Sequence, residues 1–95
     1  MKIINIEYLV DLDTIIENRP AHVEYLNKYY EQGIFMCSGR KDDSTGGIII
    51  VNTKQDINIE DIAKEDPFFI NGLSKYSILE FIPTMMCEQF ENINK

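Results

Sequence analysis

One short run limits the folds open to this chain of 95 residues: Ile48-Ile49-Ile50-Val51, which follows the pair Gly46-Gly47. Four consecutive β-branched residues favour a strand, and their side chains are apolar on both faces of that strand. Such a strand is stable only where both of its faces are covered. The run therefore predicts a central strand of a covered sheet, in a chain with the length of one domain.

Further strand and helix patterns surround this run. Asp13 begins a capped helical turn, Pro20 marks the true start of the longer helix that follows, and Gly33 marks its end. Strands are predicted at residues 2–10, 34–39, 46–51 and 75–83, and helices at about 19–32 and 58–64, the second ended by Asp66-Pro67. The order β-α-β-β-α-β predicts an α+β, ferredoxin-like fold with a four-stranded antiparallel sheet and helices on one face.

This topology leaves the second face of the sheet open. Three of the predicted strands, 2–10, 46–51 and 75–83, place apolar side chains on both faces, and an exposed apolar face of this size marks an interface. We expect a homodimer that packs through the open sheet face. Residues 1–83 form the predicted domain, and residues 84–95 are either a dimer arm or a frayed tail.

Charge and cysteine usage exclude several classes of protein. Nine Lys and Arg against sixteen Asp and Glu give a net charge of −7, which argues against a nucleic-acid partner. Apolar runs are too short to span a membrane, and Asn5 and Glu7 interrupt any export signal, so a cytoplasmic protein is expected. Cys37 and Cys87 lack metal-ligand spacing and are expected to be reduced, with Cys37 buried; no metal or cofactor is predicted.

His22 is the only histidine of the chain and the first candidate for proton transfer near neutral pH. Helical spacing places it on the same apolar stripe as Tyr25, Leu26 and Tyr29. The helix start at Pro20 places His22 in the first helical turn, where the macrodipole keeps the ring neutral and able to act as a base. The alternative is a buried histidine that hydrogen-bonds a backbone carbonyl.

Two further segments carry groups that suit a binding site. Asp66 precedes Pro67, which is typical of a turn, and the alternative is that its carboxylate reaches His22 and orients the ring. Ser38, Gly39 and Arg40 end a strand with a hydroxyl, a glycine and a cation, a set that suits an anionic group. A solvated loop is the alternative for this segment.

Three motifs resemble those of the YCII-related (YciI-like) family: Arg19-Pro20-Ala21-His22, Cys37-Ser38-Gly39-Arg40-Lys41 with Gly46-Gly47, and Glu65-Asp66-Pro67-Phe68. The resemblance covers residues 1–83. It implies a dimeric ferredoxin-like α/β barrel with a pocket beside a His–Asp pair. It also implies catalytic roles for His22 and Asp66. We further expect substrate contacts from Ser38, Gly39, Arg40, Arg19 and Phe68.

The leading functional hypothesis is therefore a cofactor-free enzyme of unassigned specificity. His22, oriented by Asp66, would move a proton on a small substrate such as a ring compound, in lyase or isomerase chemistry. One alternative is a non-catalytic module that binds a metabolite or serves as a dimeric interaction domain. A second alternative is an oxygenase of the dimeric-barrel type.

Overall fold

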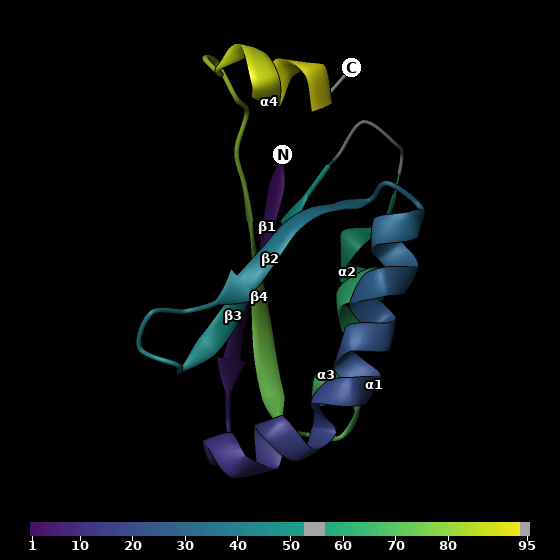
Figure 1. Cartoon of the computed structure of the whole chain (residues 1–95), viewed down its shortest axis with the longest axis vertical. Coiled ribbons are helices and arrows are strands. Elements are labelled where there is room, and N and C mark those ends of the chain that lie inside the picture. Colours follow the sequence, from purple (N-terminus) through teal and green to yellow (C-terminus); the bar gives the residue numbers. More distant parts are fainter. Residues whose placement is uncertain (53–56, 94–95) are drawn as a thin grey trace.

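The computed structural model describes residues 1–52 and 57–93 and contains four strands and four helices. In chain order they are β1 (Lys2–Tyr8), α1 (Leu12–Glu31), β2 (Phe35–Arg40), β3 (Gly46–Val51), α2 (Ile59–Lys64), α3 (Pro67–Ile70), β4 (Ser74–Glu80) and α4 (Glu88–Ile93). The strands form one antiparallel sheet in the order β2-β3-β1-β4. Figure 1 shows α1, α2 and α3 on one side of that sheet. The predicted ferredoxin-like α+β fold is confirmed.

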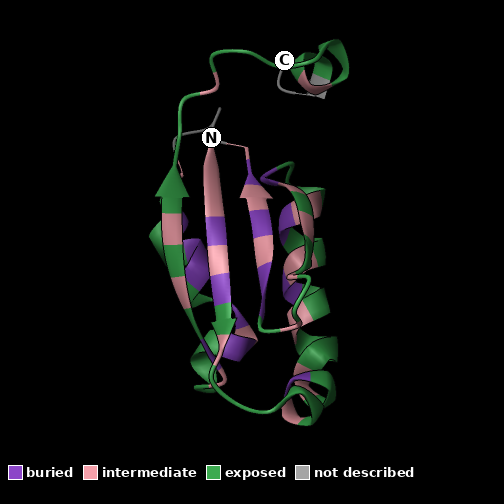
Figure 2. Ribbon diagram, turned by 90° about the vertical axis from the view of Figure 1, so that its left-hand side faces the viewer, coloured by how far each residue is buried: buried purple, intermediate pink, exposed green. Residues whose placement is uncertain are grey.

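The core lies between the sheet and α1, α2 and α3. Along β1, Ile4 and Ile6 are buried whereas Ile3 and Asn5 on the opposite face are half-buried, and Figure 2 shows this alternation. β3 lies between β2 and β1, as predicted for an interior strand. The core residues are Ile4, Ile6, Tyr25, Tyr29, Ile34, Phe35, Ile49, Val51, Ile59, Ile62 and Ala63. One face of the sheet is thus fully covered by the chain itself.

Helix α1 starts eight residues before the predicted start at Pro20, at Leu12. Asp11 caps it by accepting the backbone N–H of Thr14, and Pro20 lies inside the helix. Because proline has no N–H, one intrahelical hydrogen bond is lost there, and the helix bends near this point in Figure 1. The prediction that His22 lies in the first helical turn is therefore wrong, and so is its argument from the helix dipole.

The other boundaries differ by a few residues. Asn58 is the cap of α2 rather than its first residue, and Asp66-Pro67 ends that helix but also begins the additional short helix α3. Proline fits there because the first helical turn needs no N–H from it. Strand β1 ends at Tyr8 rather than at residue 10, and β4 ends at Glu80 rather than at residue 83.

The open face of the sheet is apolar in only one half. The register aligns Cys37, Ile50, Ile3 and Leu79 in one row across the four strands. Cys37 is exposed, so the prediction that it is buried is wrong for the single chain. The other half of this face is more polar: it carries Asn5, Ser77 and the ion pair of Glu7 with Lys75, although Ile48 lies beside Asn5.

The last helix, α4, lies beyond the end of the sheet in Figure 1, away from the covered face. It belongs to the segment 84–95, of which residues 94–95 lie outside the described part of the chain. Within residues 1–52 and 57–93, none of the helices combines the length and the apolar character that a membrane span requires.

Candidate functional site

A pocket of about 170 Å³ lies on the helix-covered side, between α1, α3 and strands β1 to β3. It is lined by Ile6, Tyr8, Arg19, His22, Val23, Leu26, Ser38, Gly39, Arg40, Gly47, Ile48, Ile49 and Phe68. Of the seven residues predicted to form the site, all except Asp66 line this pocket, and Asp66 contacts His22. The structure therefore brings all seven together.

Two glycines make room for the pocket floor. Gly47 pairs with Arg40 on one side and with Ile6 on the other, so the position between these two side chains carries no side chain of its own. Gly46 is required for a different reason: a Cβ atom there would lie 1.8 Å from the carbonyl oxygen of Ile6. Gly46 thus allows β3 to approach β1 closely, and Gly47 leaves space in the pocket above the sheet.

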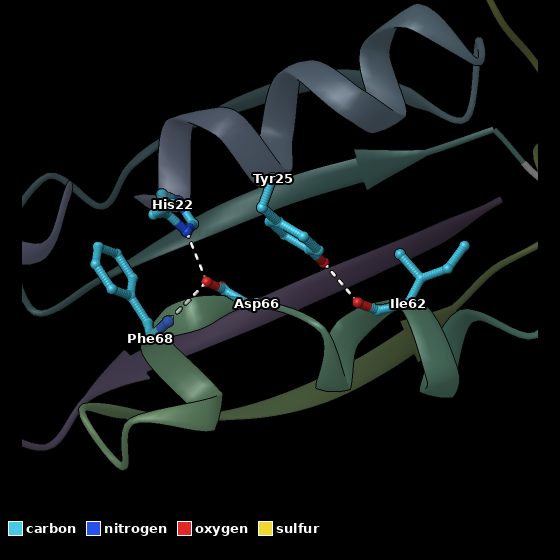
Figure 3. A network of polar contacts seen from close by, with 5 residues as sticks. All are labelled: His22, Tyr25, Ile62, Asp66 and Phe68. Carbon is cyan, nitrogen blue, oxygen red and sulfur yellow. Dashed lines mark hydrogen bonds and ion pairs between the residues drawn. The ribbon is translucent and has the colours of Figure 1, made fainter. Parts of the chain in front are cut away.

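His22 and Asp66 form a nearly buried pair at the pocket wall. The Nδ1 atom of His22 lies 2.8 Å from Oδ1 of Asp66, and their side chains are 14% and 5% exposed (Figure 3). The same oxygen accepts the backbone N–H of Phe68 at 3.0 Å. A carboxylate oxygen only accepts, so Nδ1 carries the proton, and in the neutral ring Nε2 is left as the basic nitrogen.

Aromatic rings fix the orientation of the imidazole. Phe68 stacks on it with ring centroids 4.1 Å apart and an interplanar angle of 8°, and Tyr25 lies 6.1 Å away at 35°. Phe68 is buried and follows Asp66 by two residues, so the α3 segment supplies both the carboxylate and the stacking ring. Both predictions for Asp66, the turn and the contact with His22, hold at once.

Tyrosines on the same face of α1 anchor the segment that carries Asp66. The hydroxyl of Tyr25 donates to the carbonyl of Ile62 at 2.8 Å, and that of Tyr29 donates to Glu65 at 2.6 Å (Figure 3 shows the first). Burial raises the pKa of Tyr25 and keeps it a donor. The sequence pattern placed these tyrosines only on an apolar stripe of the helix. Their hydroxyl groups, at helical spacing from His22, could have indicated that they also form hydrogen bonds near the site.

The polar groups of strand β2 and of α1 surround the rest of the pocket. The hydroxyls of Ser38 and Tyr30 lie 2.5 Å apart. Arg19 and Arg40 are exposed, and neither forms an ion pair or side-chain hydrogen bond with any residue in the described ranges. Ser38 and Arg40 thus belong to a strand that lines the pocket, and the polar loop begins only after them.

Tyr8 also lines the pocket and was predicted only as an apolar strand position. Burial raises the pKa of its hydroxyl, an effect that the charges of Arg19 and Arg40 partly offset. The two-residue period of the strand places Tyr8 on the same face as Ile4 and Ile6, and this could have indicated that it faces the helices. Within residues 1–52 and 57–93, no three His, Cys, Asp or Glu side chains gather to hold a metal ion.

The fold and the pocket together define a class of protein: a small ferredoxin-like domain with a buried histidine–carboxylate pair in a pocket wall. The chain belongs to the family of the YCII-related domain, whose family model matches residues 2–82. The resemblance found in the three sequence motifs is confirmed.

A solved structure shares the fold. It is the 5-chloro-2-hydroxyhydroquinone dehydrochlorinase of Burkholderia phenoliruptrix AC1100, in complex with 2,5-dihydroxybenzoquinone. It superposes with a TM-score of 0.66 at 20% sequence identity, covering 86% of this chain and 94% of the enzyme. A comparison with curated proteins gave no match.

Proposed function

We propose that this protein is a small-molecule enzyme in which His22, oriented by Asp66, transfers a proton to or from its substrate. The observation that carries the proposal is the 2.8 Å contact between His22 Nδ1 and Asp66 Oδ1 at the wall of a pocket. The contact holds the ring in the tautomer in which Nε2 is the basic nitrogen. A carboxylate at Nδ1 also stabilises the imidazolium that forms when Nε2 takes a proton.

The pocket supports a substrate of one ring. Its volume of about 170 Å³ is similar to the roughly 150 Å³ that holds a benzene molecule in an apolar cavity. Val23, Leu26 and Phe68 supply apolar walls, while Ser38, Gly39, Arg40 and Arg19 offer polar contacts. The dehydrochlorinase that shares the fold acts, by its name, on a substituted hydroquinone. These observations support lyase or isomerase chemistry on a ring compound.

The proposal includes an assembly and a location. Two copies pair through the open sheet face, whose apolar row of Ile3, Ile50 and Leu79 would be covered in the dimer. Residues 84–95 serve as a tail or as an arm on the partner. The protein works in the cytoplasm without a nucleic-acid partner. Light scattering tests the assembly, because a particle of 11.1 kDa rather than about twice that mass contradicts it.

The decisive experiment measures proton transfer directly. The protein is incubated in D₂O with 2,5-dihydroxybenzoquinone to follow deuterium uptake at ring carbons, and with 5-chloro-2-hydroxyhydroquinone to follow chloride release. We expect His22→Gln to abolish the protein-dependent reaction and Asp66→Asn to reduce it strongly. The matched control is Tyr76→Phe, because the Tyr76 hydroxyl donates to Glu60 outside the pocket.

The principal alternative is a metabolite-binding module that uses His22 only as a hydrogen-bond partner. In that case the ligand binds without exchange or chloride release, and His22→Gln retains most of the affinity. Binding without reaction across both probes therefore overturns the enzymatic proposal.

A further inference from the structure

Two guanidinium groups, those of Arg19 and Arg40, line the pocket together with His22. The carboxylate next to these residues, that of Asp66, contacts His22 rather than either arginine. The chain as a whole carries sixteen acidic residues against nine basic ones, yet Arg19 and Arg40 form no ion pair or side-chain hydrogen bond with residues 1–52 and 57–93. Guanidinium groups that are not neutralised by the protein suit an anionic ligand.

Tyr8 is the third polar group at this end of the pocket. Its ring meets the edge of Phe68 at a centroid distance of 6.0 Å and an interplanar angle of 87°, so it lies next to the ring that stacks on His22. Its hydroxyl forms no hydrogen bond with the residues that the structure describes. A tyrosine hydroxyl is protonated at neutral pH and can donate. Burial raises the pKa of this one, and the charges of Arg19 and Arg40 oppose that rise while the charge of Asp66 adds to it.

We propose that Tyr8, Arg19 and Arg40 form an oxyanion subsite in the pocket that His22 lines, and that the substrate is a planar organic acid whose negative charge is spread over ring oxygens. Ionised phenols, enols and hydroxyquinones belong to this class. The phenol of Tyr8 donates one hydrogen bond to the oxyanion, and the two guanidinium groups compensate its charge. The inference rests on the proposed function and names its substrate class.

In a proton transfer at carbon, this subsite would stabilise the negative charge that develops on the substrate. When Nε2 of His22 removes a proton from a carbon next to a carbonyl group, the C–H bond breaks and its electron pair forms a C=C bond. The π pair of the carbonyl then becomes negative charge on its oxygen, and the proton stays on the imidazole. Donors held where that charge develops lower the barrier, because they need little reorganisation during the reaction.

The pocket shape favours flat over branched anions. Phe68 covers one face of the imidazole, and Gly47 leaves the floor between Arg40 and Ile6 without a side chain. A planar ligand that lies on this floor would contact apolar side chains with its two ring faces and the charged groups with its edge. Charge and planarity are therefore the expected determinants of specificity.

The test compares two rings of matched skeleton by titration calorimetry. The anionic probe is 2,5-dihydroxybenzoquinone, which ionises in neutral water, and the neutral probe is 2,5-dimethoxybenzoquinone. We expect the anion to bind at least about tenfold more tightly, and Tyr8→Phe to weaken that binding by about tenfold, the effect of one hydrogen bond to a charged group. Arg40→Gln should also weaken it, and both variants should weaken binding of the anion by a larger factor than binding of the neutral ring.

Tyr76→Phe is the matched control, because it also removes one tyrosine hydroxyl and lies outside the pocket. Tyr8→Phe keeps the aromatic ring that packs on Phe68. Arg40 is exposed, so Arg40→Gln provides a second variant that should leave the fold intact. Equal affinity for both rings, absence of anion binding, or an unchanged affinity in both variants overturns the subsite.

The subsite and the proposed function fail in distinguishable ways. Charge-selective binding that depends on Tyr8, without deuterium exchange or chloride release, supports the subsite and contradicts the enzymatic proposal. The opposite result is deuterium exchange that depends on His22, together with a binding affinity that changes neither with the charge of the ligand nor in Tyr8→Phe. That result supports the enzymatic proposal and overturns the subsite.

Discussion

The ring of Phe68 stacks on the imidazole of His22, with centroids 4.1 Å apart and planes inclined by 8°. Asp66 holds both residues through one oxygen, which contacts His22 Nδ1 and accepts the backbone N–H of Phe68. The N-terminal cap of α3 is therefore also the partner of the histidine. Because the turn at the start of α3 already fixes the position of the Asp66 carboxylate, no additional residue is needed to orient the imidazole of His22.

Asp66→Asn should keep the tautomer of His22 and remove only the negative charge beside the ring. One oxygen of Asp66, Oδ1, both contacts Nδ1 and accepts the backbone N–H of Phe68, and the amide oxygen of asparagine can take over both contacts. Nδ1 therefore keeps its proton, whereas the imidazolium that forms during proton transfer loses its charged partner. Nitrogen NMR of the single labelled histidine reads this directly, because protonated and unprotonated ring nitrogens resonate far apart.

The helix cap provides the control for that measurement. Circular dichroism and the unfolding midpoint should change little, which shows that the α3 turn is intact. A ring proton that moves to Nε2 in the folded variant contradicts the role assigned to the shared oxygen. Loss of proton transfer with an unchanged tautomer supports the role of the Asp66 charge.

Tyr25→Phe should destabilise the protein by about 1 kcal/mol, because the carbonyl of Ile62 loses the Tyr25 hydroxyl and keeps only the backbone N–H of Glu65 as a donor. Urea unfolding measures the change. Tyr76→Phe removes a hydroxyl whose bond to Glu60 is exposed, so it should cost well under half as much. Equal losses in the two variants contradict the anchoring role of Tyr25.

Gly46→Ala should destabilise the sheet by about 3 kcal/mol or more, because the new Cβ atom would meet the Ile6 carbonyl oxygen at 1.8 Å and force β1 and β3 apart. Gly39→Ala provides the control, since nothing lies within 4 Å of its added Cβ. Thermal unfolding of both variants tests this. A folded Gly46→Ala with the stability of Gly39→Ala contradicts the close approach of the two strands.

The fold followed from the sequence because the strand patterns are strong and local. Ile48 to Val51 can only form an interior strand, and the order of the remaining patterns fixes the topology. The start of α1 was missed because Pro20 fits both a helix start and a bend inside a helix, and only the packing of residues 12–19 distinguishes the two. Cys37 was misplaced because alternation alone does not say which face is covered.

The residues of the candidate site were predicted as separate motifs rather than as an arrangement. His22 and Asp66 are 44 positions apart, and nothing in their local sequence sets the distance between them. Tyr8 was missed because a tyrosine in a strand is first an apolar residue; only the fold reveals that its face is the one that Arg19 and Arg40 approach. Contacts between elements are set by packing, which a single sequence does not display.

The contact of Glu65 with Tyr29 should make stability depend on pH in the acidic range. The hydrogen bond from Tyr29 lowers the pKa of Glu65 below the value of 4.5 that it has when unfolded. Its contribution is therefore complete above that value and is lost as the pH falls through the lowered folded value. Because the carboxylate is half-exposed, the effect is small and screened by salt. We expect the difference in unfolding temperature between wild type and Glu65→Gln to shrink between about pH 6 and pH 3. Tyr29→Phe should remove most of that dependence, and parallel curves for wild type and Glu65→Gln contradict it.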